Sequence, residues 1–511
     1  MDSAPPGRDL SPSWRAGSGI VAQVVRLAQT LGDIWSVRGE RTMKRQLVVV
    51  LACVAVVAAA CGRSDAPKGG GDATSSSSTA DGSTSGGTAG SADFGTLTDV
   101  CQKGSPSGAP TTGVTPDAIH VATFSDTGFV GRPGLNQEFF DTADVFSQWC
   151  NARGGINGRK IVVDKRDAAL SNVQARMVES CRDDFAMVAG GATFDQDGVA
   201  TRLGCLLPDV AGFVTSPKAR GADLLVQPLP NPLGKLQIGI LNYLGRKYPD
   251  ATDHVGVLTG DIATTKIVAA DNATAAKSLG WKISYNDVYP VIGMSDWTPY
   301  VQKLKDTGTK GLIWVGEPEG LGGLMSALRD IGYKLDFVRA DANHYDRKLI
   351  DTAGSALADK NVYVSSAFYP FEQAKPSNAT GEYLQLFEDA KPGGKSRTYL
   401  GLQAWSAWLL FAKAASSCGS DLTRTCLYDA AKKISAWTGG GLHAETSPGT
   451  TGATQCFALE QATPKGFVLV TDTKPNDGIY NCNPKNLFTL APDAADVTTL
   501  ADVGKSIDDL K

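Results

Sequence analysis

Apolar positions along this chain follow two patterns: short continuous runs, and longer stretches where apolar residues recur every three or four positions. Residues 145–195 show both, with a helix ending at Gly154-Gly155, a strand over 160–164, a second helix and an apolar run over 185–189. Glycine accepts the left-handed conformation of a helix cap, and Asn157-Gly158 suits a turn with positive φ. This order predicts a parallel sheet covered by helices, because parallel neighbours need crossover connections.

The same arrangement recurs further along the chain. Four times a helix ends near glycine and a Lys or Arg introduces a strand: GGINGRKIVV, SLGWKISY, TGTKGLIWV and DIGYKLDFV. The period is too loose for a solenoid repeat and is typical of alternating α/β units. Because 511 residues exceed what one hydrophobic core usually holds, the units predict two lobes.

Outside the opening unit's own helices, these patterns predict ten strands, seven helices whose ranges follow, and one further helix with Leu321, Leu324, Met325 and Leu328 inward that is capped at Gly332. We predict strands over 115–124, 160–164, 185–189, 210–214, 224–227, 254–259, 281–288, 311–315, 337–340 and 361–365. We predict helices over 197–206, 236–244, 264–279, 299–307, 378–390, 399–417 and 422–436. Residues 456–482 should close the second lobe, and 491–511 form a weak tail.

The helix predicted over 399–417 carries the stripe Leu402, Trp405, Leu409 and Ala412. Aromatic residues in such a stripe can form a ligand platform, but core packing is the interpretation we favour. Ligands in parallel sheets bind at the carboxyl ends of strands, so the loop over 191–195 is the first candidate for a site.

Composition narrows the function classes. The chain is 42% apolar and 20% charged with a formal net charge of −4, which is ordinary for a globular protein and gives no basic excess for nucleic acid. None of the four histidines lies in a metalloprotease motif, and no phosphate loop or nucleophile elbow is found. No cofactor or metal is therefore expected. An enzyme is disfavoured, although a dispersed active site stays an open alternative.

The start of the chain indicates export. Met43-Lys44-Arg45 precedes the apolar run Leu47–Ala60, which is too short for a bilayer of about 30 Å but suits a signal peptide over 43–60. Residues 58–62 resemble a bacterial lipobox, with Cys61 as the lipidated residue; an ordinary signal peptide with a coincidental cysteine is the alternative. Residues 1–42 would be an upstream extension, and the Ser/Gly-rich residues 61–95 a flexible linker.

Eight cysteines remain after Cys53 and Cys61, and an even number in an exported protein suggests disulfides. Eight cysteines allow 105 connectivities. Proximity in sequence favours Cys181–Cys205, Cys418–Cys426 and Cys456–Cys482, which leaves Cys101–Cys150. Each bond would contribute typically about 2–4 kcal/mol. No Cys-x-x-Cys or Cys/His cluster indicates a zinc site.

Five segments, taken in order, resemble the type I solute-binding proteins of ABC transporters, in the leucine/isoleucine/valine-binding group. They are the lipobox with its linker, GGINGRKIVV, VAGFVTSPKA, WVGEPEGLGGLMSALRDIGYK and LGLQAWSAWLL. The resemblance implies an α/β fold of two doubly wound parallel-sheet lobes joined by a three-strand hinge, which closes on a small molecule. It implies lobe 1 over 112–232 and 366–440, and lobe 2 over 233–365 and 441–490, followed by a tail over 491–511.

The resemblance also implies a binding site between the lobes. Carried over by position, the ligand contacts are Phe129, Thr193, Phe194, Asp195, Thr215 and Ser216 from lobe 1 and Glu317 and Asp341 from lobe 2. In this family hydroxyls and backbone N–H groups hold a ligand carboxylate, an acid holds its ammonium, and an aromatic side chain forms a wall. A plain turn at Thr215-Ser216-Pro217 is the structural alternative for that pair.

The loop that usually offers serine here carries Asp195. With Asp126, Glu317, Glu319 and Asp341, this residue predicts an acidic cleft, which favours a cationic, amide or polyhydroxy ligand. Solvated loop acids are the alternative for each of them. An enclosed carboxylate should accept a hydrogen bond or pair with a cation, because burying an unpaired charge costs about 3 kcal/mol or more.

These patterns predict a lipid-anchored receptor on the outer face of the bacterial cytoplasmic membrane. It would capture a small polar solute, such as an amino acid or an amide, and deliver it to an ABC transporter permease. We expect a monomer. A ligand-sensing module of the same fold is the main alternative, and an extracytoplasmic enzyme is a weaker one.

Overall fold

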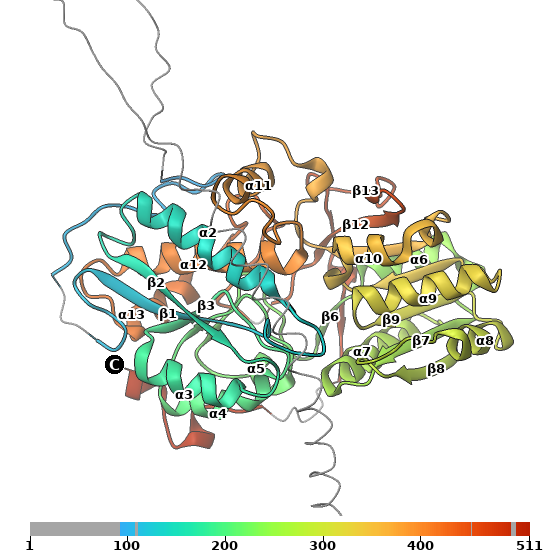
Figure 1. The fold of residues 1–511 in the computed structure, drawn as a ribbon, viewed down its shortest axis with the longest axis horizontal. Helices are drawn as coiled ribbons and strands as arrows, with labels where there is room; N and C mark the ends of the chain where they lie inside the picture. Colours follow the sequence, from blue (N-terminus) through green and yellow to red (C-terminus); the bar gives the residue numbers. More distant parts are fainter. Residues whose placement is uncertain (1–91, 108–110, 451, 492–496, 511) are drawn as a thin grey trace, which may run out of the picture. The chain divides into compact units, whose positions relative to one another are not determined.

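The structure is a computed structural model that describes residues 92–107, 111–450, 452–491 and 497–510. The extension, the signal peptide, Cys61 and most of the predicted linker lie outside these residues. Two main sheets organise the described chain, and we call the sheet over 118–226 with its helices the first lobe and the sheet over 255–482 with its helices the second lobe (Figure 1).

The first sheet has five parallel strands in the order β2-β1-β3-β4-β5. Its strands are β1 (Ala118–Ser125), β2 (Lys160–Asp167), β3 (Ala186–Val188), β4 (Asp209–Val210) and β5 (Leu225–Val226). Alternate residues of β1 face opposite helix layers: Val121 packs in one core cluster with Phe139 of α2 (Gln137–Ala152), and Ala122 in another with Met177 of α3 (Val173–Asp183). α4 (Val199–Gly204) packs beside α3.

The second sheet runs in the order β13-β12-β11-β10-β9-β7-β8. Its strands are β7 (Val255–Gly260), β8 (Ile283–Tyr289), β9 (Gly311–Val315), β10 (Phe337–Ala340), β11 (Val362–Ser366), β12 (Cys456–Thr463) and β13 (Gly466–Leu469), with β14 (Asn481–Cys482) beside β12. β7 to β11 are parallel, whereas β12 pairs antiparallel with β11, β13 and β14. Residues 456–482 thus close the second lobe, as predicted.

Helices cover both faces of the second sheet. Ile313 and Val315 belong to the core cluster of α6 (Gly239–Lys247) and α7 (Ala263–Ser278), whereas Leu312 and Trp314 belong to that of the opposite layer. The opposite layer contains α8 (Thr298–Asp306), α9 (Pro318–Asp330) and α10 (Arg347–Ala353). The doubly wound α/β arrangement predicted from the sequence is therefore present in both lobes.

The turn at 154–158 shows why glycine is needed there. Gly154, Gly155, Asn157 and Gly158 all have positive φ. A Cβ at Gly155 would lie 2.0 Å from the carbonyl oxygen of Arg159, which no rearrangement of side chains could relieve. The turn brings β2 directly beside β1, in register from Ala118 with Lys160.

Four helical or strand predictions need correction. The strand predicted over 210–214 ends at Val210, and the helix predicted from 236 begins at Gly239, because residues 235–237 form β6 (Lys235–Gln237). β6 pairs with β15 (Leu487–Thr489), a partner 250 positions away that local periodicity does not reveal. The helices predicted over 197–206 and 422–436 are shorter, as α4 and as α13 (Arg424–Lys433).

α12 (Tyr399–Ser417) is the central helix of the first lobe. Trp405 and Trp408 are fully buried, and their rings pack with Phe146 and Trp149 of α2 and with Phe94. The predicted stripe of Leu402, Trp405, Leu409 and Ala412 is therefore part of the hydrophobic core, as we expected. Because Phe94 is also fully buried, the last residues of the predicted linker, 92–95, belong to the folded lobe.

The structure contains the four disulfides that proximity in sequence favours. They are Cys101–Cys150, Cys181–Cys205, Cys418–Cys426 and Cys456–Cys482. Three of them fasten the first lobe, and the fourth joins β12 to β14. Among the helices in the described ranges, none combines the length and the apolar character needed to cross a bilayer.

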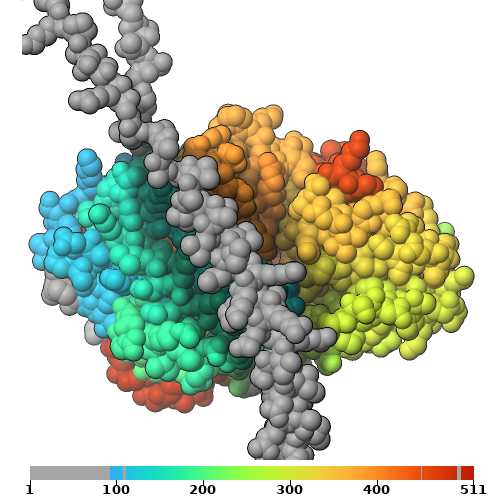
Figure 2. All heavy atoms as spheres, viewed as in Figure 1, coloured from blue at the N-terminus to red at the C-terminus, as the bar shows by residue number. Residues whose placement is uncertain are grey.

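Residues 497–510 of the predicted weak tail pack against the first lobe. Leu500 and Leu510 are buried in one cluster with Val199 and Leu203 of α4, and Leu500 N–H donates to Asp223 Oδ2 at 2.8 Å. Figure 2 shows this segment in dark red against the first lobe. Since β15 lies on the second lobe with α6, the chain crosses between the lobes a fourth time, where three crossings are expected.

One carboxyl group is buried in the second sheet with no partner among the described residues. Glu460 of β12 pairs through its backbone with Val364 and Leu469, and both oxygens of its side chain lack hydrogen bonds. Burial raises its pKa well above the usual range, and the charge of Glu372 raises it further. Because an unfolded glutamate titrates near about 4.3, unfolding above that pH releases a proton, and stability falls as the pH rises.

We predict that Glu460→Gln reduces the pH dependence of the melting temperature between pH 5 and 8. The wild-type protein should lose stability as the pH rises, whereas the neutral amide has no proton to release. Thermal unfolding followed by circular dichroism measures this slope, with Glu388→Gln on an exposed face of α11 (Ala379–Ala390) as the control. An unchanged slope in Glu460→Gln would show that this carboxyl does not titrate abnormally.

Candidate binding site

A cavity of about 420 Å³ lies between the two lobes. Its first-lobe wall comes from loops after β1, β3 and β4 and from α12, and its second-lobe wall from loops after β9, β10 and β11 and from α6 and α7. These loops follow the carboxyl ends of parallel strands in both sheets, which is where ligands of such folds bind. The volume falls in the range of about 300–1,000 Å³ typical of small-molecule sites.

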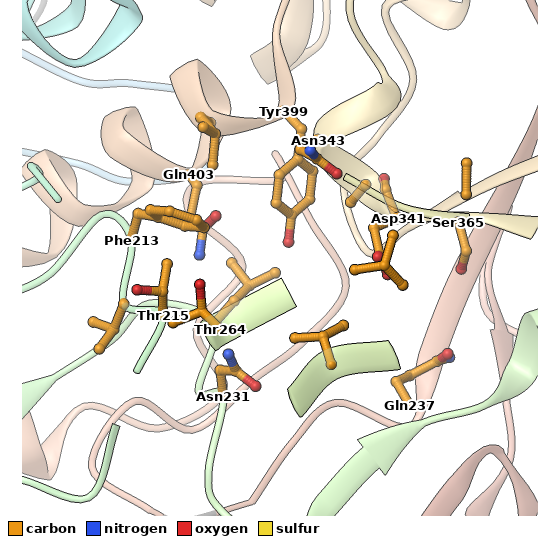
Figure 3. Close-up of a pocket in the computed structure, with 18 of the residues that line it drawn as sticks. Phe213, Thr215, Asn231, Gln237, Thr264, Asp341, Asn343, Ser365, Tyr399 and Gln403 are labelled. Atoms are coloured by element: carbon orange, nitrogen blue, oxygen red, sulfur yellow. The ribbon is translucent and has the colours of Figure 1, made fainter. Parts of the chain in front are cut away.

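Aromatic and aliphatic side chains form much of the cavity wall. Phe213 follows β4, and Tyr399 opens α12 and points into the cavity (Figure 3). Burial raises the pKa of Tyr399 to about 12, so its hydroxyl is neutral at physiological pH. The aliphatic lining includes Leu229, Leu236, Ile240, Val268, Val315 and Leu400.

Amide and hydroxyl groups stand between these apolar surfaces. Those labelled in Figure 3 are Thr215, Asn231, Gln237, Thr264, Asn343, Ser365 and Gln403. Gln403 lies four positions after Tyr399 on α12, so both occupy one face of the helix. A glutamine at this spacing inside a mainly apolar helix is the sequence signal that could have revealed the pair.

The structure divides the eight residues predicted to contact the ligand into two groups. Thr193, Thr215, Glu317 and Asp341 line the cavity. Phe129, Phe194, Asp195 and Ser216 are not among the lining residues. Ser216 caps α5 (Pro217–Arg220), where its hydroxyl accepts from Ala219 N–H at 3.2 Å, as the turn alternative anticipates.

Two first-lobe acids accept hydrogen bonds from the backbone of cavity-forming loops. Asp195 Oδ2 accepts from Thr215 N–H at 2.6 Å, and Oδ1 accepts from Ser216 N–H at 3.1 Å. Asp126 accepts from Thr193 N–H at 2.7 Å and from Leu170 N–H at 2.8 Å. Burial raises the pKa of Asp195, although the hydrogen bonds from Ser216 and Thr215 oppose this effect.

An ion pair joins the lobes at the cavity. Arg132, in the loop between β1 and α2, binds Glu317 and Glu319 at the start of α9, with Nε 2.7 Å from Glu319 Oε1. Burial lowers the pKa of Arg132, but the charges of the two glutamates outweigh it and raise the pKa above its usual value. Burial raises the pKa of Glu317, and the charge of Arg132 opposes that shift.

Asp341 also has a cationic partner. Arg339 Nη1 lies 2.6 Å from Asp341 Oδ1, and the arginine is buried within β10. An arginine inside the apolar run FVRA needs a nearby anion, and the acid two positions later projects to the same side of the strand. This spacing could have identified the pair from the sequence.

The charged residues that line the cavity balance one another. Five are cationic, Arg132, Arg220, Lys235, Arg339 and Lys395, and five are anionic, Glu138, Asp271, Glu317, Asp341 and Asp346. The expectation of an acidic cleft is therefore wrong. Asp126 and Asp195 accept hydrogen bonds from backbone N–H groups, Glu317 and Glu319 pair with Arg132, and Asp341 pairs with Arg339. These acids therefore give the cavity no preference for a cationic ligand.

Residues 240–467 match the sequence model of the periplasmic binding protein family. A fatty acid ABC transporter substrate-binding protein from Thermomonospora curvata is similar in structure, with a TM-score of 0.59 and 16% identity over 72% of this chain and 95% of that one. A branched-chain amino acid ABC transporter protein from Thermus thermophilus with bound valine is also similar in structure, with a TM-score of 0.58 and 15% identity over 72% of this chain and 98% of that one. Comparison with curated protein sequences gives no match.

The chain has the type I periplasmic binding protein fold. A leucine-binding protein from Thermotoga maritima is a further structural neighbour of this fold, with a TM-score of 0.56 and 13% identity over 69% of this chain and 97% of that one. At these identities the likeness concerns the fold, and the contacts of any ligand have to be argued from this chain's own residues.

Within this fold, the buried histidines have structural partners. Trp314 Nε1–H donates to His344 Nε2 at 2.8 Å, and Ser406 Oγ–H lies 2.8 Å from His443 Nε2. Burial lowers the pKa of each histidine to about 4. Ser406 is fully buried and accepts from Trp437 Nε1–H, so a substrate cannot reach this serine. Over the described ranges, no cluster of His, Cys, Asp and Glu side chains could hold a metal ion.

We predict that Arg132→Met weakens closure of the two lobes in the absence of ligand. The change removes the cation that joins Glu317 and Glu319 to the first lobe and leaves Glu317 without its partner. Small-angle scattering should give a larger radius of gyration than for wild-type protein. Arg347→Met is the matched control, because it breaks an exposed pair with Asp351 inside α10. Equal radii for all three proteins would contradict the prediction.

Proposed function

We propose that this protein is an extracytoplasmic solute-binding protein that captures a small molecule between its lobes and delivers it to an ABC transporter permease. The cavity between the strand ends of both sheets is the observation that carries the proposal. Its apolar walls and convergent amide and hydroxyl groups are typical of a site that binds a small molecule. The family match over 240–467 and the transporter proteins among its structural neighbours support the same function.

We propose that the ligand is larger and less polar than the amino acid or amide that the resemblance implies. A cavity of about 420 Å³ with Phe213 and Tyr399 in its wall has room for a substantial apolar body. The neighbour from Thermomonospora curvata is described as a fatty acid substrate-binding protein, and this supports a ligand with an extended apolar part here. Closure around such a ligand removes its apolar surface from water, which supplies the driving force for binding.

We predict that Thr264→Trp abolishes ligand binding, whereas Thr274→Trp preserves it. Both residues lie on α7, but only Thr264 lines the cavity, so the indole at this position fills the space that a ligand needs. Thermal-shift screening of wild-type protein against amino acids, amides, polyamines, sugars and fatty acids identifies a probe, because a ligand at 100 times its Kd stabilises by about 2.7 kcal/mol. Equal shifts in both variants would place binding outside the cavity.

We also propose that Cys61 carries the lipid anchor and that residues up to 91 include the tether. Two acyl chains hold a protein at a membrane far more firmly than one, since each buried methylene contributes about 0.8 kcal/mol. We predict that Cys61→Ser moves the protein from the membrane fraction into the medium and abolishes incorporation of labelled palmitate. Cys53→Ser, within the signal peptide, is the control. Retention of the label by Cys61→Ser would assign the anchor elsewhere.

A further inference from the structure

The N–H groups that could hold an anionic ligand on the first lobe are already bound. Thr193 N–H donates to Asp126, and Thr215 N–H and Ser216 N–H donate to Asp195. These are the amides at the carboxyl ends of β3 and β4, beside the cavity. A ligand carboxylate would have to displace an internal carboxylate that the protein holds in the same place.

Most of the charged side chains that line the cavity face a partner within the protein, although Arg339 Nε and Nη1 and Glu138 Oε2 make no hydrogen bond with any described residue. Arg132 binds Glu317, Arg339 binds Asp341, and Lys395 Nζ lies 3.5 Å from Glu138 Oε2. Arg220 donates to the carbonyl oxygens of Asn231 and Pro232 at 2.9 Å each. A charged ligand group would enter a site whose cations and anions are equal in number, so no net charge compensates it.

Three neutral polar atoms of residues that line the cavity also lack hydrogen-bond partners. Gln403 Oε1, Asn272 Oδ1 and Gln237 Nε2 are buried and make no hydrogen bond with any described residue. Gln403 is 7% exposed and Asn272 is 1% exposed. Asn272 Nδ2 donates to Val268 O at 2.8 Å, and Gln237 Oε1 accepts from Gly239 N–H at 3.0 Å. These bonds fix the orientation of each side-chain amide and leave Asn272 Oδ1 and Gln237 Nε2 without a partner.

A buried polar atom that has no partner within the protein is satisfied when a ligand supplies one. Two of these atoms are acceptors, and they lie on different lobes, Gln403 on α12 and Asn272 on α7. The third, on β6, is a donor. A ligand with hydroxyl or amide hydrogens and one acceptor oxygen meets all three, and the two acceptors make its binding favour closure of the lobes.

We propose that the ligand is an uncharged amphipathic molecule, with an apolar body against Phe213, Tyr399 and Val268 and with amide or hydroxyl groups that bind Gln403, Asn272 and Gln237. This assignment rests on the proposed solute-binding function and specifies its substrate class. Fatty acid anions and α-amino acids fall outside the class, because each carries charged groups and the charged residues that line the cavity already balance one another in number.

The test uses probes that share a skeleton and differ in charge. Calorimetry at pH 7.5 compares 4-phenylbutanamide with 4-phenylbutanoate and 4-phenylbutylamine, decanamide with decanoate, and N-acetyl-L-leucinamide with L-leucine. At least one amide should bind, and at least tenfold more tightly than its charged counterparts. Mass spectrometry of small molecules released by denaturing the protein, purified from its own host, should give a neutral amphipathic compound.

Two variants separate recognition from packing. Gln403→Leu should weaken binding of the amide at least tenfold, and Gln403→Glu should shift the preference toward 4-phenylbutylamine, because it introduces an anion into a balanced site. Gln385→Leu, on an exposed face of α11, is the control and should bind like wild type. A merely structural glutamine would not produce the shift toward the amine.

The outcomes distinguish this inference from the proposed function. Tighter binding of decanoate, 4-phenylbutanoate or L-leucine than of the matched amide would overturn the uncharged class and leave solute binding standing. A charged compound released from the purified protein would do the same. If no probe binds and no compound is released, both the substrate class and the solute-binding function are wrong.

Discussion

The backbone N–H groups at the carboxyl ends of β3 and β4 need acceptors, and this requirement shapes the first-lobe wall of the cavity. In an open site, water or a ligand would meet it. Here the carboxylates of Asp126 and Asp195 do so, reaching Thr193, Thr215 and Ser216. Because hydrogen bonds to a carboxylate are stronger than those between neutral groups, the loops are held by the lobe itself and keep their shape without a ligand. The cavity is therefore preorganised on this side.

The second lobe is held to this wall by charge. Arg132 meets Glu317 and Glu319 across the boundary, and its side chain and both glutamates are only partly exposed. Separating the lobes would leave a cation on one side and two anions on the other, each of which has to be hydrated again. A chain that crosses four times between the lobes, with its last segment packed on α4, adds a further constraint on the opening motion. Closure of this protein thus depends on contacts of its own as well as on a ligand.

The order of elements could be predicted from the sequence because each depends on its neighbours along the chain. β9 and β10 are short apolar runs bounded by turns, and both have the predicted ends. α12 also begins and ends as predicted, since its apolar residues continue for five turns. β6 was missed for the opposite reason: its partner β15 is far away in sequence, and the pairing overrides a local pattern that suits a helix.

The site was harder to predict, because a sequence gives the type of each residue but not its partner. Asp195 and Glu317 look alike as loop acids, yet one accepts from its own lobe's backbone and the other binds an arginine of the opposite lobe. The acidic cleft was inferred by counting acids without the arginines that neutralise them. Gln403 and Tyr399 were passed over since their helix is mainly apolar, although the i, i+4 spacing places them on one face.

Preorganised loops and internally paired charges together limit what the cavity can recognise. A cavity whose cationic and anionic residues are equal in number offers little net attraction to a charged ligand, so we expect selectivity to come mainly from shape, apolar contact and the neutral atoms that lack partners. Gln403 and Asn272 lie on opposite lobes, and each keeps an acceptor without a partner. A ligand that binds both acceptors therefore has to contact both lobes. The neutral atoms that lack partners therefore couple ligand binding to closure of the lobes. The Arg132 ion pair, in contrast, favours closure of the lobes even without a ligand.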